Sequence, residues 1–323
     1  MKLRETSFNL CFATLLVVLA GCSESPPSAQ EASAPMDSLV SAEWLMARVG
    51  DPDLVVLDAT VLVQSDAAAN MEIVNGRASY EEGHIPGAGF AELMGELSAA
   101  DAEFDFTLPS PQAFADAMGA LGVGDETRVV LYDRMGMPWA GRVWWMLRWI
   151  GFDNAALLDG GLDAWTAAGG ALSTEPVTRS PRTLSVKLRP ELIANQDEVR
   201  ASIEDDAIRL IDVLPEIHYR GEWTMYEQPG HIPGAINVPT STLFDESGHF
   251  HEDEKLAELF GDDADARTIT YCGGGIAASL DAFVMTRLGF TDAAIYDGSL
   301  EEWTATPDNP MDIDLEGFGG AGE

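Results

Sequence analysis

The six residues GHIPGA at positions 83–88 recur without change at positions 230–235. Similar segments flank both copies in the same order. Before the copies stand LVVLD (54–58) and IRLID (208–212), and after them stand VVLYD (129–133) and TITYC (268–272), then GFDNAALLDGGLDAW (151–165) and GFTDAAIYDGSLEEW (289–303). A long ordered set of matches of this kind indicates that the chain contains one structural unit twice in tandem.

The apolar segments of each repeat predict a parallel sheet. Runs of four or five residues rich in Val, Leu and Ile are typical of strands buried on both faces. Helical spacing follows in the segments 111–121, 140–150, 257–260 and 276–288. Because strands that alternate with helices pair in parallel and are covered by helices, we expect an α/β fold of two small domains, each a parallel sheet flanked by helices.

The repeats also divide the chain. We assign residues 39–171 to the first domain and residues 193–308 to the second. The segment 172–192 between them contains prolines and has no helical period, so it is predicted to be a linker. Residues 309–323 are acidic and Gly-rich and are expected to form a loose tail.

Residues 1–21 have the pattern of a secretory signal peptide. Lys2 and Arg4 precede an apolar run that is too short for a comfortable membrane span, and small residues precede Cys22. The ending LAGC (19–22) resembles the lipobox of bacterial lipoproteins, which implies that Cys22 is lipidated and holds the protein in the cell envelope, at the outer membrane facing the periplasm. A plain signal peptide with a chance Cys is the alternative. The polar segment 22–38 would then be a flexible tether.

The balance of charge excludes one class of partner. The chain has 18 Lys and Arg against 54 Asp and Glu, a formal net charge of -36. Binding to a phosphate backbone depends on Lys and Arg, and a surface this acidic repels it. Nucleic acid is therefore excluded as a main ligand, and the only membrane contact expected is the lipid anchor.

The second repeat carries a cysteine where chemistry is favoured. Its strand runs into Cys272, then into Gly273, Gly274 and Gly275, and a helix follows with Ile276 and Ala277. Three glycines let the backbone curl round one atom. The N–H groups and the positive end of the helix are then expected to stabilise an anion at the sulfur and to lower the pKa of the thiol. The alternative is an inert core cysteine, the commonest use of a lone Cys.

Together these motifs resemble the tandem-domain rhodanese family of sulfurtransferases, which includes thiosulfate and 3-mercaptopyruvate sulfurtransferases. The paired GHIPGA segments, the strand, Cys, glycine loop and helix, and the repeated D-G-G/S-L-x-x-W carry the resemblance, which covers about residues 40–306. It implies that Cys272 forms a persulfide in the second domain, held by backbone N–H groups from Gly273 to Ala277. It also implies that the first domain, with Asp133 at the matching place, is catalytically silent, and that no metal or organic cofactor takes part.

The resemblance further implies the substrates. The donor would be a small sulfur anion, with thiosulfate favoured and 3-mercaptopyruvate as the other candidate, and the acceptor would be cyanide or a thiol, a thioredoxin-like protein among them. The loop departs from both patterns, because Gly273 and Gly274 stand where thiosulfate enzymes carry Arg and Lys, and Gly274 stands where mercaptopyruvate enzymes carry Ser. A persulfide relay that receives sulfur from a protein partner, with little turnover of small donors, is the alternative function.

An anionic donor needs a local cation, which the loop lacks. Arg220 is our first candidate, because it lies between the 208–212 strand and the second GHIPGA, and Arg134 and Arg142 flank the silent loop. Leu214 and His218 occupy the places of the two arginines that bind the substrate carboxylate in mercaptopyruvate enzymes.

Other motifs are assigned structural roles. Phosphatase chemistry on this fold requires an Arg six residues after the Cys, where its guanidinium binds an oxyanion. That position holds Ala278, so phosphatase chemistry is not expected. His84 and His231, one in each GHIPGA, are predicted to bond to the backbone near their turns. The segment 249–251 (HFH) is expected to be a solvated loop rather than a metal site. The aromatic helix at 143–149 is expected to pack in the core and between the domains.

Overall fold

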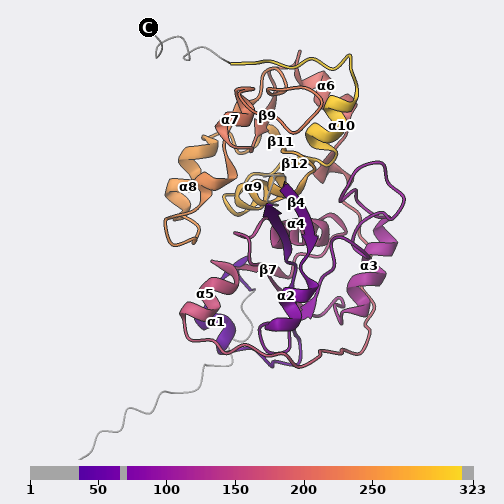
Figure 1. Ribbon diagram of the computed structural model, residues 1–323, viewed down its shortest axis with the longest axis vertical. Coiled ribbons are helices and arrows are strands. Elements are labelled where there is room, and N and C mark those ends of the chain that lie inside the picture. The colour runs from indigo at the N-terminus through magenta and orange to yellow at the C-terminus, as the bar shows by residue number, and fades with distance from the viewer. Residues whose placement is uncertain (1–35, 66–70, 315–323) are drawn as a thin grey trace, which may run out of the picture. The chain divides into compact units, whose positions relative to one another are not determined.

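The computed structural model describes residues 36–65 and 71–314 (Figure 1). The signal peptide and Cys22 lie outside the described residues, so lipidation and localisation stay predictions. No helix in the described part of the chain is both long and apolar enough to cross a membrane.

Two five-stranded parallel sheets have the same strand order. The first sheet runs β1 (Leu39–Val40), β7 (Ala155–Leu158), β6 (Arg128–Tyr132), β2 (Leu54–Asp58) and β5 (Gly89–Phe90). The second runs β8 (Ile193–Ala194), β12 (Ala293–Tyr296), β11 (Arg267–Tyr271), β9 (Ile208–Asp212) and β10 (Ile236–Asn237). Each predicted strand thus has its counterpart in the other sheet, and the predicted α/β fold with two tandem domains is confirmed.

Strand β2 shows why these segments form central strands. Leu54 and Val56 contribute to one hydrophobic core, whereas Val55 and Leu57 contribute to another. Successive side chains of a strand point to opposite faces, so a strand with apolar residues at every position must be covered on both faces. Helices supply that cover.

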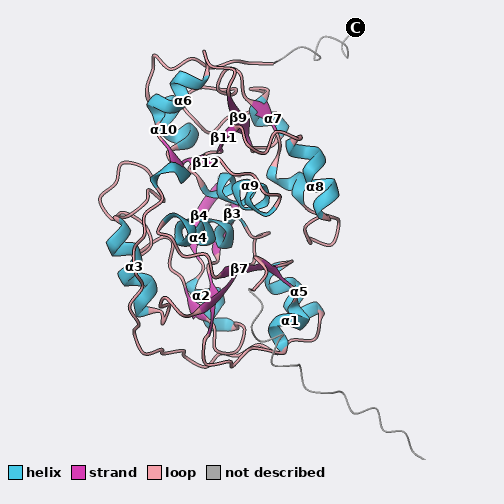
Figure 2. Cartoon of the chain, turned by 180° about the vertical axis from the view of Figure 1, so that it is seen from behind, coloured by secondary structure: helices cyan, strands magenta, loops and turns pink. Residues whose placement is uncertain are grey.

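Ten α-helices accompany the strands in the described residues (Figure 2). In the first domain they are α1 (Ala42–Met46), α2 (Arg77–Glu82), α3 (Pro111–Ala120), α4 (Pro138–Trp149) and α5 (Gly161–Ala167). In the second they are α6 (Gln196–Ser202), α7 (Glu216–Tyr219), α8 (Asp253–Phe260), α9 (Ile276–Arg287) and α10 (Ser299–Ala305). The helical segments expected at 111–121, 140–150 and 276–288 agree with α3, α4 and α9 to within two residues at each end.

Helices α4 and α9 lie side by side between the two sheets (Figure 1). A Cβ added at Gly141 on α4 would lie 2.8 Å from Cδ1 of Leu280 on α9, so a glycine lets the two backbones approach. Nearby, the Trp144 and Phe283 rings meet edge to face with centroids 4.8 Å apart. One core therefore spans both domains, which confirms the packing role expected for the aromatic helix.

Two features differ from simple expectation. Strands β3 (Val61–Ser65) and β4 (Met71–Asn75) form an antiparallel hairpin that the sequence patterns did not indicate. The linker 172–192 also lies along the first domain, because its Arg182 N–H donates to Gly119 and its Lys187 N–H donates to Ile150. Those backbone hydrogen bonds hold the connection in place.

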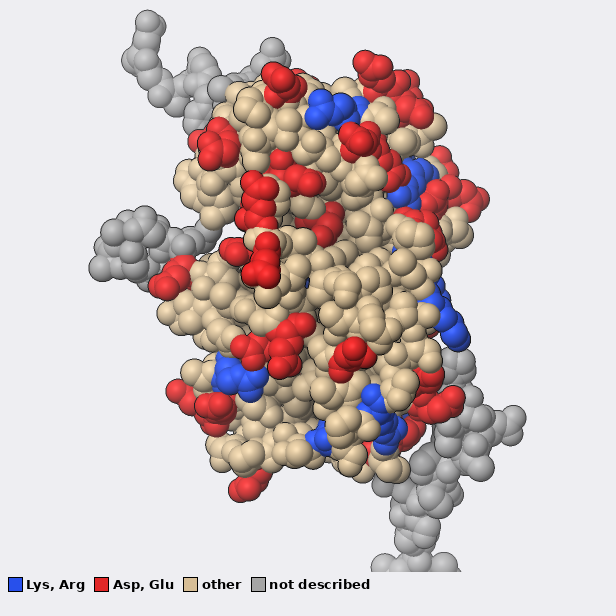
Figure 3. Space-filling model, turned by 90° about the vertical axis from the view of Figure 1, so that its right-hand side faces the viewer, with Lys and Arg blue, Asp and Glu red and all other residues tan. Residues whose placement is uncertain are grey.

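The excess of acidic residues is visible on the surface. On the face shown in Figure 3, Asp and Glu side chains are scattered over the whole height of the molecule, and Lys and Arg are fewer. A long-range repulsive field of this kind acts on any anion that approaches, although salt screens it beyond about 8 Å.

Candidate active site

Cys272 lies between the end of β11 and the start of α9, and its side chain is buried, with 3% of the residue exposed. The backbone turns sharply at Gly275, which has a φ of +73°. A Cβ added there would lie 2.7 Å from the carbonyl oxygen of Asp297 and 3.0 Å from Nη1 of Arg142. Both the left-handed conformation and the lack of space therefore call for glycine at this position.

The thiol of Cys272 lies among polar groups of the loop and the helix. The backbone N–H groups of Ala278, Gly274 and Ala277 and the hydroxyl of Ser299 act to lower its pKa, but burial acts more strongly, and the pKa of the thiol is raised above its usual value. The expectation of a lowered pKa is therefore wrong for the protein without a bound donor. Burial removes the water that would solvate a thiolate, and few polar groups replace it.

The loop residues divide into donors and supports. Of the predicted set, Gly274 and Ala277 face the sulfur, and Ala278, which we did not expect to take part, joins them. Gly275 directs its N–H to Ser299 instead, and Ile276 contributes its side chain to the core. The carbonyl of Gly273 accepts a hydrogen bond of 2.9 Å from the N–H of Glu301.

Ser299 organises the loop, and sequence reasoning missed it. Its Oγ accepts hydrogen bonds of 3.1 Å from the N–H groups of Cys272 and Gly275 and donates one of 2.7 Å to the carbonyl of Tyr296. Its φ of +48° is unusual for a residue with a side chain. The first copy of the repeated motif has Gly161 at the corresponding place, with a φ of +57°, and that glycine could have indicated a left-handed backbone here.

The first domain shows which kind of group the corresponding loop can surround. Asp133 follows β6 as Cys272 follows β11, and its Oδ1 accepts from the N–H groups of Met135 and Met137. Its Oδ2 accepts from Trp139 and Ala140, in the first turn of α4. Burial raises the pKa of Asp133 to about 6, so the group is still an anion at neutral pH. The same architecture thus surrounds a negative group in the first domain and a thiol in the second.

Arg142 is the cation that the structure places against the loop. It is fully buried on α4 of the first domain, and its guanidinium donates to the carbonyl of Gly275 at 3.3 Å. It also donates to the carbonyl of Phe106 at 2.9 Å and pairs with Asp297 at 2.5 Å. The first domain therefore helps to fix the loop of the second domain.

The other predicted cations have acidic partners elsewhere. Arg220 pairs with Glu222 at 3.0 Å and with Glu216 at 3.5 Å, and Arg134 lies 3.8 Å from Asp58. Because two carboxylates compensate the charge of Arg220, these contacts give no support to the prediction that it binds the donor.

Two further side chains at the loop were not predicted. A Cβ added at Gly273 would lie only 2.0 Å from the hydroxyl oxygen of Tyr226, so the loop accommodates Tyr226 because it has glycine there. Burial and the charges of Cys272 and Glu301 raise the pKa of Tyr226, which stays neutral. The carboxylate oxygens of Glu301 would lie 3.3 Å and 3.6 Å from a Cβ added at Gly274.

The histidines make backbone or surface contacts. Nδ1 of His84 lies 2.9 Å from the carbonyl oxygen of Tyr80, and Nδ1 of His231 lies 2.7 Å from that of Tyr219, as the structural assignment predicts. His249 lies 3.0 Å from Asp159. Within residues 36–65 and 71–314, no three His, Cys, Asp or Glu side chains gather as a metal site would require.

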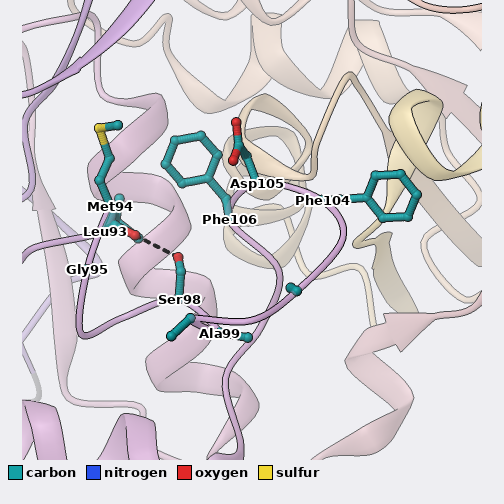
Figure 4. Close-up of a pocket in the computed structure, with 10 residues that line it drawn as sticks. Leu93, Met94, Gly95, Ser98, Ala99, Phe104, Asp105 and Phe106 are labelled. Atoms are coloured by element: carbon teal, nitrogen blue, oxygen red, sulfur yellow. Dashed lines mark hydrogen bonds between the residues drawn. The ribbon is translucent and has the colours of Figure 1, made fainter.

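A pocket of about 370 Å³ lies in the segment 93–106 of the first domain (Figure 4). Figure 4 shows Asp105 and Phe106 among its lining residues, and the hydrogen bond that Ser98 donates to the carbonyl of Leu93, two further lining residues. Asp105 raises the pKa of Glu301, and Phe106 accepts from Arg142, so this pocket borders the loop of the second domain.

The chain matches the family model described as "Rhodanese-like domain" over residues 41–168 and again over residues 195–306. It is 35% identical over 303 residues to thiosulfate/3-mercaptopyruvate sulfurtransferase 2 of Arabidopsis thaliana, with 85% of this chain and 86% of the relative covered. It is 34% identical over 277 residues to thiosulfate sulfurtransferase of Gallus gallus, with 82% and 93% covered.

The fold is also similar to a solved structure, that of the 3-mercaptopyruvate sulfotransferase SseA from Escherichia coli. The TM-score is 0.72 at 29% sequence identity, and the match covers 82% of this chain and 99% of the other.

Proposed function

Because the chain belongs to the family with rhodanese-like domains and is a sulfurtransferase, we propose that Cys272 is its nucleophile and carries the transferred sulfur as a persulfide. The Cys272 thiolate attacks the outer sulfur of the donor, a sulfur–sulfur bond forms, and the rest of the donor leaves with the bonding electron pair. A cyanide or thiolate acceptor then attacks the outer sulfur of the persulfide and regenerates the Cys272 thiolate.

The observation that carries this proposal is the set of N–H groups aimed at the sulfur. The N–H groups of Gly274, Ala277 and Ala278 act to lower the pKa of the thiol, which lies at the start of α9, a twelve-residue helix whose positive end faces the site. Preorganised donors of this kind stabilise negative charge that develops during a reaction. The first domain supports the argument, because the carboxylate of Asp133 accepts hydrogen bonds from the N–H groups of Met135 and Trp139, which correspond to Gly274 and Ala278.

The free thiol of high pKa is consistent with this role. Burial disfavours the thiolate before the donor binds, and the persulfide formed afterwards places its charge on a second sulfur atom within reach of the loop. The donor is a small sulfur anion, for which thiosulfate and 3-mercaptopyruvate, the compounds named for the relatives, are the two candidates.

The purified protein is mixed with thiosulfate and cyanide, and thiocyanate is measured. We expect Cys272→Ser to abolish thiocyanate formation, while Cys22→Ser, which changes a cysteine that precedes both predicted domains in the sequence, leaves it unchanged. Intact mass after donor alone should increase by one sulfur atom in the parent protein and not in Cys272→Ser.

Thiocyanate formation that survives Cys272→Ser would refute the assignment of the nucleophile. A sulfur adduct on Cys272 without steady-state turnover of either donor would instead favour a persulfide relay that is loaded by a protein partner.

A further inference from the structure

The second residue of the loop, Gly274, has an acidic side chain beside it. The two carboxylate oxygens of Glu301 lie 3.3 and 3.6 Å from the position that a Gly274 Cβ would take, the nearer one in tight contact. The backbone of Glu301 is fixed on the same loop, because its N–H donates to the carbonyl of Gly273 at 2.9 Å. The N–H of Gly274 is also one of the groups that act to lower the pKa of Cys272. The carboxyl group therefore lies next to the atoms that surround the nucleophile.

The surroundings of Glu301 favour a carboxyl group that can hold a proton near neutral pH. Its side chain is half-buried, and burial together with the charge of Asp105 raises its pKa to about 7. Tyr226 is a further ionisable group near it, and the ion pair of Arg142 and Asp297 lies at Gly275. A group with a pKa near the working pH is suited to both giving and taking a proton.

The first domain provides an internal comparison. Asp163 takes the place of Glu301 in the first copy of the motif, and it is exposed beside a loop that has no cysteine. The neighbour of Glu301 on α10, Glu302, belongs to a different environment, because its carboxylate lies 2.5 Å from the position of a Cβ at Gly298. Glu301 thus differs from both acids in lying against the catalytic loop.

We propose that Glu301 is the proton relay of the sulfur-transfer site and that it equips the enzyme for donors whose sulfur is bonded to carbon, namely a thiol next to a keto group, as in 3-mercaptopyruvate. This inference rests on the proposed role of Cys272.

The Cys272 thiolate attacks the sulfur of the donor thiol, the sulfur–sulfur bond forms, and the carbon–sulfur bond breaks with its electron pair going to carbon as an enolate. Protonated Glu301 gives its proton to that carbon, which yields the keto acid, pyruvate for this donor. The outer sulfur then gives its own proton to the Glu301 carboxylate, and the persulfide anion remains on the loop. The net change moves one proton from sulfur to carbon.

Thiosulfate places no such demand on the site. Its sulfur–sulfur bond breaks to release sulfite, which needs no proton, and an ionised Glu301 beside the loop repels the dianion. The two donors therefore distinguish a proton relay from a group that only supports the loop, because both reactions use Cys272 and produce the same persulfide.

The test compares Glu301→Gln with the matched variant Glu302→Gln, using thiosulfate and 3-mercaptopyruvate as donors and cyanide as acceptor. We expect Glu301→Gln to lower kcat/KM for 3-mercaptopyruvate by about 100-fold or more, the usual contribution of a general acid, and to leave kcat/KM for thiosulfate unchanged or raised. Retained thiosulfate turnover also shows that the variant is folded. In the parent protein, kcat/KM for 3-mercaptopyruvate should fall above a pH of about 7, and Glu301→Gln should lose that limb of the profile.

Two results overturn the inference. One is an equal loss with both donors in Glu301→Gln, which would assign Glu301 to loop structure, and the other is undiminished turnover of 3-mercaptopyruvate. Glu301→Asp, which keeps an acid but shortens it, should recover part of the lost activity. Failure of the proposed function has a different signature, since turnover would then survive Cys272→Ser with either donor.

Discussion

Ser299 gives the sharpest test of how the loop is built. In Ser299→Ala the N–H groups of Cys272 and Gly275 lose their acceptor, and both are buried where water does not replace it. A buried donor left without a partner costs about 1–3 kcal/mol, so two cost about 2–6 kcal/mol. Backbone strain does not change, because Ala and Ser are equally disfavoured at a φ of +48°.

The free energy of unfolding is measured in urea for the parent protein and three variants. Ser299→Gly removes the same acceptor but relieves the left-handed strain, and it should be about 1 kcal/mol more stable than Ser299→Ala. Ser202→Ala is the control, because the Ser202 hydroxyl only donates to the carbonyl of Val199. We expect it to cost less than about 1 kcal/mol.

The kcat/KM for thiosulfate should rank the variants in the same order as their free energy of unfolding. The released N–H groups let the loop relax away from the shape that holds the sulfur, so kcat/KM for thiosulfate should fall in Ser299→Ala although Cys272 is intact. The reasoning would be refuted if Ser299→Ala unfolds within about 0.5 kcal/mol of the parent protein, the range of an ordinary surface substitution.

Two further predictions concern buried charges. Arg142→Met should lower the free energy of unfolding by about 3–5 kcal/mol, because it leaves the carboxylate of Asp297 without the guanidinium that it pairs with. In a double-mutant cycle, Asp297→Asn should cost less in the Arg142→Met background than in the parent protein. Full additivity of the two changes would contradict the pairing. For Asp212, burial raises the pKa to about 7, above its unfolded value, so its contribution to stability is full below the unfolded pKa and is lost as the pH rises through 7. As the pH rises from 5 to 8, the free energy of unfolding of Asp212→Asn should therefore increase relative to that of the parent protein, on the order of 2–4 kcal/mol. A difference between the two proteins that does not change with pH would contradict the raised pKa.

The elements of the fold were accessible to sequence reasoning because their signals are local. The run LVVLD is apolar at nearly every position, which requires a strand covered on both faces, and β2 spans the same five residues. The duplication then supplied the second sheet from the first. The hairpin of β3 and β4 was missed. Its apolar residues Val63 and Ile73 are exposed, so the alternation of apolar and polar residues that marks a half-buried strand is absent.

The site was accessible only in part, for the same reason. Cys272 and its glycines are neighbours in sequence, so their loop could be predicted. Ser299 is 27 residues away from Cys272 and reaches it because the parallel strands β11 and β12 end at one edge of the sheet. Arg142 is 133 residues from Gly275 and reaches it because α4 packs on α9.

The sequence by itself therefore determined the tandem α/β architecture, the repeat that carries Cys272 and the repeat that carries Asp133 at the same place, and the glycine loop, because each of these follows from residues that are close together in the chain. The tertiary structure decided which arginine meets the loop, that Glu301 and Tyr226 lie beside it, and that the pKa of Cys272 is raised rather than lowered. These properties depend on burial and on charges brought from distant segments, and the free energy of a buried thiol is a sum over all of them.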